Sequence, residues 1–169
     1  MQLNPRSYQK AIFETAKKAN TLVVLPTGIG KTLIALMLAK HRLAEHVPTK
    51  ALMLAPTKPL VEQHHLSFQN QLDDLFAELT TFTGTTPSSE RRKLWTTSDI
   101  IFSTPQCIAN DLKNSLYSLE DVSLLIIDEA HRFLKNYDYT RVVEYYKQQA
   151  SHQRILGLTA SPGSDSGII

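Results

Sequence analysis

The chain has 169 residues, enough for one domain with a single substantial core. Its hydrophobic fraction of 42% and charged fraction of 20% are those of a globular protein and exclude a disordered chain. No apolar run approaches the roughly 20 residues that cross a bilayer, and the first residues are not a signal peptide, so we expect a cytoplasmic or nucleoid-associated protein with no membrane partner. The single cysteine excludes an internal disulfide framework. A net charge of +2 is too small to indicate nucleic-acid binding by itself.

Short apolar runs alternate with segments of helical spacing along the chain. In chain order the runs predict strands at 21–25, 51–55, 79–82, 99–103, 123–127 and 154–158. The longer segments between them predict helices, among them 31–44, 59–75 and 139–150. Strands that are apolar at successive positions are typical of an α/β domain, in which helices cover both faces of a mostly parallel sheet. In that architecture ligands bind beyond the carboxyl ends of the strands.

A glycine-rich turn separates the first predicted strand from the first long helix. Its backbone N–H groups can surround phosphate oxygens at the positive end of the helix dipole. Lys31 would contact the β- and γ-phosphates of a nucleotide, and the Thr32 hydroxyl would bind Mg²⁺. The strict phosphate-loop pattern has glycine in place of Leu25, and the alternative is a helix capped by chance. The predicted nucleotide contacts are Leu25, Pro26, Thr27, Gly28, Ile29, Gly30, Lys31 and Thr32.

Two adjacent carboxylates, Asp128 and Glu129, follow the fifth predicted strand. Asp128 would hold the hydration shell of Mg²⁺, while Glu129 would orient and deprotonate an attacking water. Adjacent carboxylates repel each other, so a function explains the pair better than stability does. The structural alternative is that both stabilise the start of a helix. Beside the phosphate loop, we predict Lys31, Asp128 and Glu129 as the catalytic residues.

The order of these motifs resembles that of superfamily 2 helicases. Residues 26–32 are similar to motif I, residues 128–131 (Asp-Glu-Ala-His) to a motif II of the DEAH-box type, and residues 159–161 to motif III. Residues 6–9 resemble the upstream glutamine motif, residues 55–60 motif Ia, and residues 104–105 motif Ib. The sequences of residues 54–61 and 158–163 are similar to those of archaeal Hef and eukaryotic FANCM helicases. The resemblance spans nearly the whole chain and implies one RecA-like phosphate-loop NTPase domain over residues 1–169.

The resemblance also implies roles for further residues. Gln9 would read the adenine edge of ATP, and Arg6 would help to fix that pocket; for Arg6 the alternative is a surface position at a helix start. His131, Thr159 and Ser161 would couple the nucleotide state to movement. For the threonines of the nucleic-acid site the alternative is an ST-turn or a helix cap. The implied contacts with the sugar–phosphate backbone of one strand are Pro56, Thr57, Lys58, Thr83, Gly84, Thr104 and Pro105.

Relatives of this kind use a second RecA-like domain, whose arginines complete the ATP site, and nothing in this sequence resembles it. We therefore expect a motor domain that binds Mg²⁺, ATP and one nucleic-acid strand but is nearly inactive in hydrolysis alone. DNA, in repair or fork processing, is favoured over RNA. The alternatives are an RNA-directed helicase, a restriction-type translocase and a nucleotide-gated clamp without turnover. A small-molecule phosphotransferase would have no need of residues 55–58 and 159–161.

Three other features receive structural interpretations. The basic run at 91–93 predicts a solvated helix face, with an approach to nucleic acid as the alternative. Cys107 is expected to pack as a small apolar group. Histidines outside the motifs, including His64 and His65, have no zinc spacing with Cys107 and receive no role.

Overall fold

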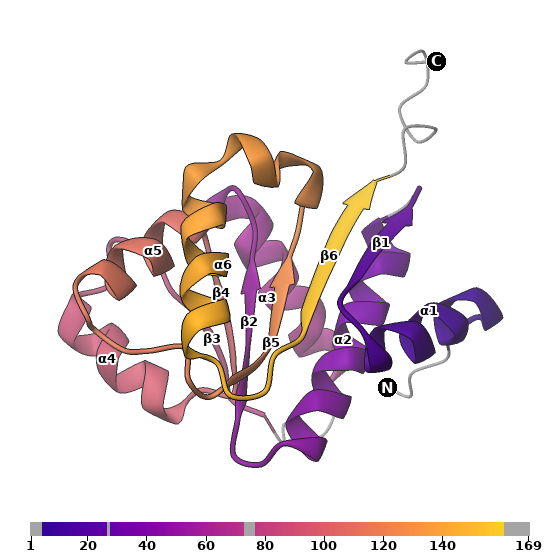
Figure 1. Cartoon of the computed structure of the whole chain (residues 1–169), viewed down its shortest axis with the longest axis horizontal. Coiled ribbons are helices and arrows are strands. Elements are labelled where there is room, and N and C mark those ends of the chain that lie inside the picture. The colour runs from indigo at the N-terminus through magenta and orange to yellow at the C-terminus, as the bar shows by residue number, and fades with distance from the viewer. Residues whose placement is uncertain (1–4, 27, 73–76, 161–169) are drawn as a thin grey trace.

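The computed structural model describes residues 5–26, 28–72 and 77–160. Six strands form one sheet in the order β1-β6-β5-β2-β4-β3, and all neighbouring strands are parallel (Figure 1). This confirms the α/β fold, and each strand lies where an apolar run predicts one. The strands are β1 (Thr21–Leu25), β2 (Lys50–Leu54), β3 (Leu79–Thr81), β4 (Ile100–Ser103), β5 (Val122–Ile127) and β6 (Ile155–Ala160).

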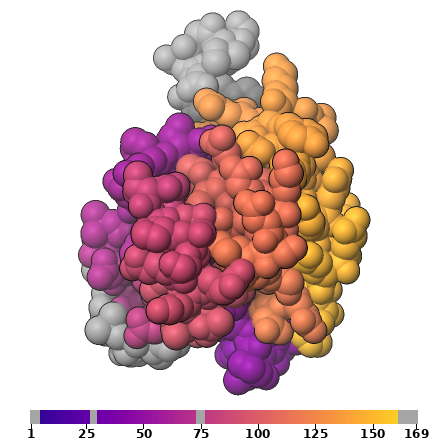
Figure 2. Space-filling view, turned by 90° about the vertical axis from the view of Figure 1, so that its left-hand side faces the viewer, coloured from indigo at the N-terminus to yellow at the C-terminus, as the bar shows by residue number. Residues whose placement is uncertain are grey.

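Helices cover both faces of the sheet. The chain crosses the sheet in one direction from β1 to β3 and returns from β3 to β6. Because crossovers between parallel strands are right-handed, the helices of the two directions lie on opposite faces. Figure 2 shows the side of the molecule that carries α4 and α5, in pink and salmon. The helices are α1 (Ser7–Lys18), α2 (Gly28–Glu45), α3 (Lys58–Gln71), α4 (Ser88–Thr97), α5 (Pro105–Lys113), the 3₁₀ helix η1 (Ala130–Lys135) and α6 (Tyr137–Gln149).

The central strand β2 shows why the strands are apolar at successive positions. Ala51 and Met53 pack into the core under α1, α2 and α3. Leu52 and Leu54 pack into the second core, under α4, α5 and α6. Every residue of β2 is buried, as expected for a strand covered on both faces.

The carboxyl ends of the parallel strands meet at one edge of the sheet, the upper edge in Figure 1. The loops after β1 and β5 and the end of β6 carry the predicted nucleotide and coupling motifs, and these strands are neighbours at one end of the sheet. The loops after β2, β4 and β3 carry the predicted strand-binding motifs and are neighbours at the other end. The sheet order therefore separates the two predicted sites along a common edge. None of the described helices has both the length and the apolar character needed to cross a membrane.

Candidate nucleotide and nucleic-acid site

A pocket of about 310 Å³ lies where the loops after β1 and β5 meet α3. Lys31 and Thr32, in the first turn of α2, line it together with Asp128 and Glu129. The structure thus brings together the predicted catalytic residues, which are almost 100 positions apart in the sequence. The N-terminus of α2 adds backbone N–H groups and the positive end of a helix dipole, an arrangement that suits an anion. Thr27, the side chain of Ile29 and Ser161 lie outside the described residues.

Asp128 is held at each of its polar groups. Its backbone N–H donates to the carbonyl of Leu54 at 2.8 Å, and the hydroxyl of Tyr139 donates to its carbonyl oxygen at 2.9 Å. Its carboxylate Oδ2 lies 2.7 Å from Nε2 of His64, and both side chains are buried. Burial, together with the negative charge of Asp128, raises the pKa of Tyr139, so this hydroxyl remains a donor. The orientation of Asp128 is therefore set by β2, α3 and α6.

Glu129 adopts a left-handed backbone conformation, with φ 54° and ψ 43°, between β5 and η1. It occupies the residue before η1, but its side chain makes no capping hydrogen bond. The carboxylate of Asp128 is bonded to His64 instead. Glu129 is therefore the N-cap residue of η1, as the structural alternative states, but neither acid makes a side-chain capping bond there.

The two described members of the predicted coupling group are in contact. Nδ1 of His131 lies 2.8 Å from the hydroxyl of Thr159, and its Nε2 lies 3.3 Å from a carboxylate oxygen of Glu129. Thr159 is within β6, which extends to Ala160 rather than ending at residue 158 as the sequence predicts. His131 thus bridges the end of β6 and the acidic residue at the pocket.

The glutamine motif lies against the phosphate loop. The side chain of Gln9 accepts from the backbone N–H of Arg6 at 2.8 Å and donates to the carbonyl of Gly30 at 3.4 Å. A Cβ at Gly30 would lie 3.3 Å from the Tyr8 hydroxyl and 3.6 Å from Gln9 Nε2, so glycine lets α1 approach α2 closely. Leu25, at the end of β1, packs against the first core. Adenine recognition by Gln9 and Arg6 stays a prediction.

The predicted strand-binding threonines begin two helices. The hydroxyl of Thr57 accepts from the backbone N–H of Leu60 at the start of α3, and that of Thr104 accepts from Cys107 at the start of α5, each at 3.4 Å. Both are therefore helix N-caps, as the structural alternative states. Lys58 is exposed beside Thr57. Pro56 precedes the first cap, and Pro105 follows the second and is buried. These cap roles leave the helix N-termini at the edge of the sheet, and strand binding stays a prediction.

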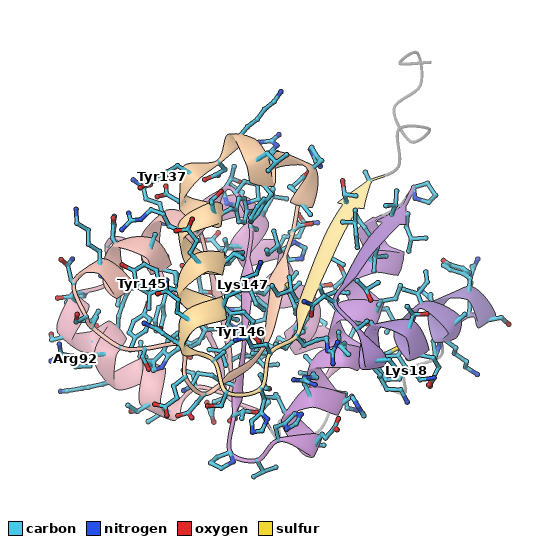
Figure 3. The ribbon with its side chains drawn as sticks, viewed as in Figure 1. Lys18, Arg92, Tyr137, Tyr145, Tyr146 and Lys147 are labelled. Atoms are coloured by element: carbon cyan, nitrogen blue, oxygen red, sulfur yellow. The ribbon has the colours of Figure 1, made fainter. Side chains whose placement is uncertain are left out.

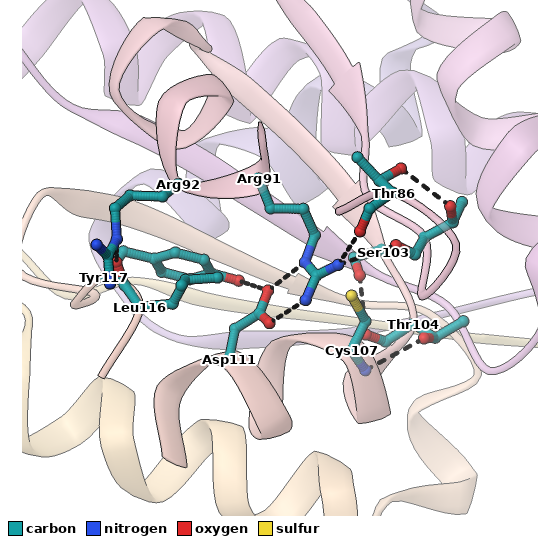
Figure 4. A network of polar contacts seen from close by, with 10 residues as sticks. Thr86, Arg91, Arg92, Ser103, Thr104, Cys107, Asp111, Leu116 and Tyr117 are labelled. Atoms are coloured by element: carbon teal, nitrogen blue, oxygen red, sulfur yellow. Dashed lines mark hydrogen bonds and ion pairs between the residues drawn. The ribbon is translucent and has the colours of Figure 1, made fainter. Parts of the chain in front are cut away.

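The third predicted strand contact, Thr83 and Gly84, lies in a turn held by Arg91 (Figure 4). The guanidinium of Arg91 donates to the carbonyl of Thr86 and, at 3.4 Å, to that of Thr83. It also forms a bidentate ion pair with Asp111 on α5, at 2.6 and 2.9 Å. The expectation of a solvated face for 91–93 is therefore wrong for Arg91, whose side chain is only 12% exposed. The neighbouring Arg92 does lie on the outer side of α4 (Figure 3).

Asp111 connects Arg91 to the aromatic side of the second core. The hydroxyl of Tyr117 donates to its Oδ2 at 2.7 Å (Figure 4). The ring of Tyr117 in turn stacks on Trp95 with centroids 3.9 Å apart. The hydrogen bond to Asp111 raises the pKa of Arg91, and burial raises the pKa of Tyr117. Cys107, as predicted, is buried in this core.

One wall of the pocket was not predicted from the sequence. Besides Leu60, it consists of polar residues on a single face of α3, which share a spacing of three or four positions. His64 touches Asp128 and is the member of this wall with a direct link to the acidic pair. The spacing is visible in the sequence, but its orientation toward β5 is not. The pocket residues on α3 are Leu60, Gln63, His64, Ser67 and Gln71.

Comparisons with known proteins agree with this geometry. Residues 6–166 match the DEAD/DEAH box helicase family. The chain is 40% identical over 165 residues to the ATP-dependent DNA helicase mph1 of Neurospora crassa, covering 97% of this chain and 14% of that protein. It is 38% identical over 160 residues to the Fanconi anemia group M protein homolog of Mus musculus, covering 95% and 8%.

The fold also matches a solved structure, the crystal structure of the Pyrococcus furiosus Hef helicase domain. The TM-score is 0.88 at 48% sequence identity, over 98% of this chain and 35% of that one. The chain thus spans a minor part of the length of each relative described here. Since the family match covers nearly all of the sequence, the chain belongs to the DEAD/DEAH box helicase family.

Proposed function

We propose that the chain is the ATP-binding motor domain of an ATP-dependent DNA helicase or translocase that acts in DNA repair or fork processing. The proposal depends on one observation, that Lys31, Thr32, Asp128 and Glu129 line the same pocket. Residues 128–131 read Asp-Glu-Ala-His, which supports assignment to the DEAH-box type. The name of the mph1 relative, an ATP-dependent DNA helicase, supports DNA over RNA. We place its activity in the cytoplasm or on the nucleoid, where the DNA lies.

The pocket residues divide the work of ATP hydrolysis. Lys31 supplies a positive charge for the β- and γ-phosphates. Glu129 orients the attacking water and accepts a proton from it. The Thr32 hydroxyl and the Asp128 carboxylate are oxygen donors in the same pocket, which suits Mg²⁺. Mg²⁺, when bound, neutralises charge on the phosphate oxygens. A second RecA-like domain is the expected source of arginine, because the described lining of the pocket contains none.

Nucleic acid is proposed to lie along the other half of the sheet edge. The N-termini of α3 and α5, with Lys58 beside the first, offer N–H groups and positive charge to the phosphates of one strand. Such contacts follow the backbone and do not read bases. Both ligands then meet the same edge, so that movement at one half can be transmitted along the sheet to the other.

Replacing Lys31 with alanine tests the nucleotide site. We expect the free energy of ADP or ATP binding to weaken by about 1.5–3 kcal/mol, the value of a hydrogen bond to a charged group. Calorimetry measures the affinity, circular dichroism checks the fold, and Lys40→Ala, exposed on the same helix, is the matched control. Unchanged affinity in folded Lys31→Ala would remove the assignment.

A second calorimetric experiment compares the affinity of the chain for forked DNA with its affinity for duplex RNA. Tighter binding of RNA would refute the DNA proposal.

A further inference from the structure

The predicted metal ligand Asp128 has one degree of freedom that the backbone leaves open. Its N–H and carbonyl are bonded to Leu54 and Tyr139, so the peptide on each side cannot turn freely. These bonds do not set the rotation of the carboxylate about its side-chain torsions. Of the described residues, it is His64 whose side chain bonds to that carboxylate, at 2.7 Å.

The contact is formed by the order of the strands. Because β2 lies beside β5, the helix that follows β2 starts next to the carboxyl end of β5. Thr57 caps this helix, α3, and His64 follows two turns later on the face that lines the pocket. An ionised carboxylate can only accept a hydrogen bond, so Nε2 of His64 carries the proton and donates it to Oδ2. A short, buried contact of this kind holds both side chains in one orientation.

We propose that His64 is a positioning residue for Mg²⁺ binding, an inference that rests on the proposed metal role of Asp128. By binding Oδ2, the imidazole leaves Oδ1 without a protein partner among the described residues and free to accept from the hydration shell of the metal. By fixing the rotation of the carboxylate, it holds Asp128 in one orientation in the pocket that Thr32 also lines. Residues that orient a metal ligand in this way typically contribute 10- to 100-fold to metal affinity.

The experiment measures how much Mg²⁺ adds to nucleotide binding. ADP affinity is determined by calorimetry at pH 8, first in EDTA and then over a series of Mg²⁺ concentrations. In EDTA, His64→Leu should bind ADP with the affinity of the wild type. Its Mg²⁺ affinity should be about 10- to 100-fold weaker. His64→Gln, whose amide can still donate to Oδ2, should recover most of the Mg²⁺ affinity. His64→Asn, with the same amide on a shorter chain, should not.

The adjacent histidine provides the matched control. His65 lies on the same helix, but its ring stacks on Phe102 and its Nδ1 lies 2.6 Å from the Thr81 hydroxyl, away from Asp128. His65→Leu should therefore destabilise the helix without changing Mg²⁺ affinity. Folded His64→Leu with wild-type Mg²⁺ affinity overturns the proposal, as does a loss of equal size in His65→Leu. If His64→Leu does not fold, equal Mg²⁺ affinities in the Gln and Asn variants overturn it.

The same measurements separate this inference from the proposed function. A wild-type chain that binds no nucleotide, or that binds it independently of Lys31, contradicts the proposed function. A wild-type chain with Lys31-dependent and Mg²⁺-dependent binding, combined with an unaffected His64→Leu variant, leaves the function intact and removes only the role of His64.

Discussion

Replacing Asp111 with alanine should destabilise the fold far more than replacing an exposed charge nearby. Asp111 accepts two hydrogen bonds from Arg91 and one from Tyr117, and its side chain is only 3% exposed. The substitution leaves the Arg91 guanidinium, itself 12% exposed, without its counter-charge. Removing one partner of a buried ion pair costs about 3–5 kcal/mol.

This cost can be compared with two smaller ones. Tyr117→Phe removes one of the three bonds and keeps the ion pair, so we expect about 1.5–3 kcal/mol. Arg92→Ala removes one exposed hydrogen bond, from the guanidinium to the Leu116 carbonyl, so we expect a cost of at most about 0.5–1.5 kcal/mol. For a domain of this size, about 2–4 °C per kcal/mol gives a fall in Tm of roughly 6–20 °C for Asp111→Ala.

Urea unfolding followed by circular dichroism measures the three differences. Fluorescence of Trp95, which stacks on Tyr117, gives an independent signal from the same core. Replacing the pair together, as Arg91→Met with Asp111→Leu, should recover part of the lost stability, since apolar groups can replace a buried ion pair, although the Tyr117 hydroxyl then lacks its acceptor. If Asp111→Ala costs no more than Arg92→Ala, the reasoning from burial is refuted.

Three further predictions concern strand binding, turnover and pH. Lys58→Ala should lower the slope of log affinity for single-stranded DNA against log salt by about one, because one phosphate contact is lost. The chain alone should bind ATP but release phosphate barely above background, with or without forked DNA, because an arginine that contacts the γ-phosphate is worth about 10³–10⁵ in rate. Burial lowers the pKa of His65, so the unfolded chain takes up its proton more readily. The free energy of unfolding should therefore fall as the pH drops below about 6.5, and His65→Gln should reduce that dependence.

Each of these has a clear contrary result. A salt slope unchanged by Lys58→Ala would place the strand away from α3. Rapid DNA-stimulated phosphate release would show that the chain completes its own active site or does so by self-association. Stability of His65→Gln that depends on pH as steeply as that of the wild type would assign the acid sensitivity to other groups.

Local sequence patterns predicted those parts of the site that depend on neighbouring residues. The phosphate loop is recognisable because Lys31 and Thr32 follow an apolar strand and open a helix. Asp128 and Glu129 are recognisable because they end an apolar run. Both features depend on a few successive residues, and both lie at the carboxyl edge where parallel strands are expected to place ligand-binding loops.

The parts that were missed depend on the order of the strands. His64 reaches Asp128 only because β2 lies beside β5, and no periodicity in the sequence determines that order. Arg91 is of a residue type usually found on the surface, yet only 12% of its side chain is exposed, because α5 places Asp111 against α4. A charged residue in a basic run and a histidine without metal spacing therefore have roles that only the tertiary contacts reveal.

The left-handed conformation of Glu129 implies a conflict between thermodynamic stability and turnover. A residue with a Cβ in this region costs roughly 1–2 kcal/mol relative to glycine. Glycine at position 129 should thus give a more stable domain that lacks the carboxylate proposed to activate water. The stability of this loop and the proposed role of Glu129 in activating water therefore favour different residues at the same position.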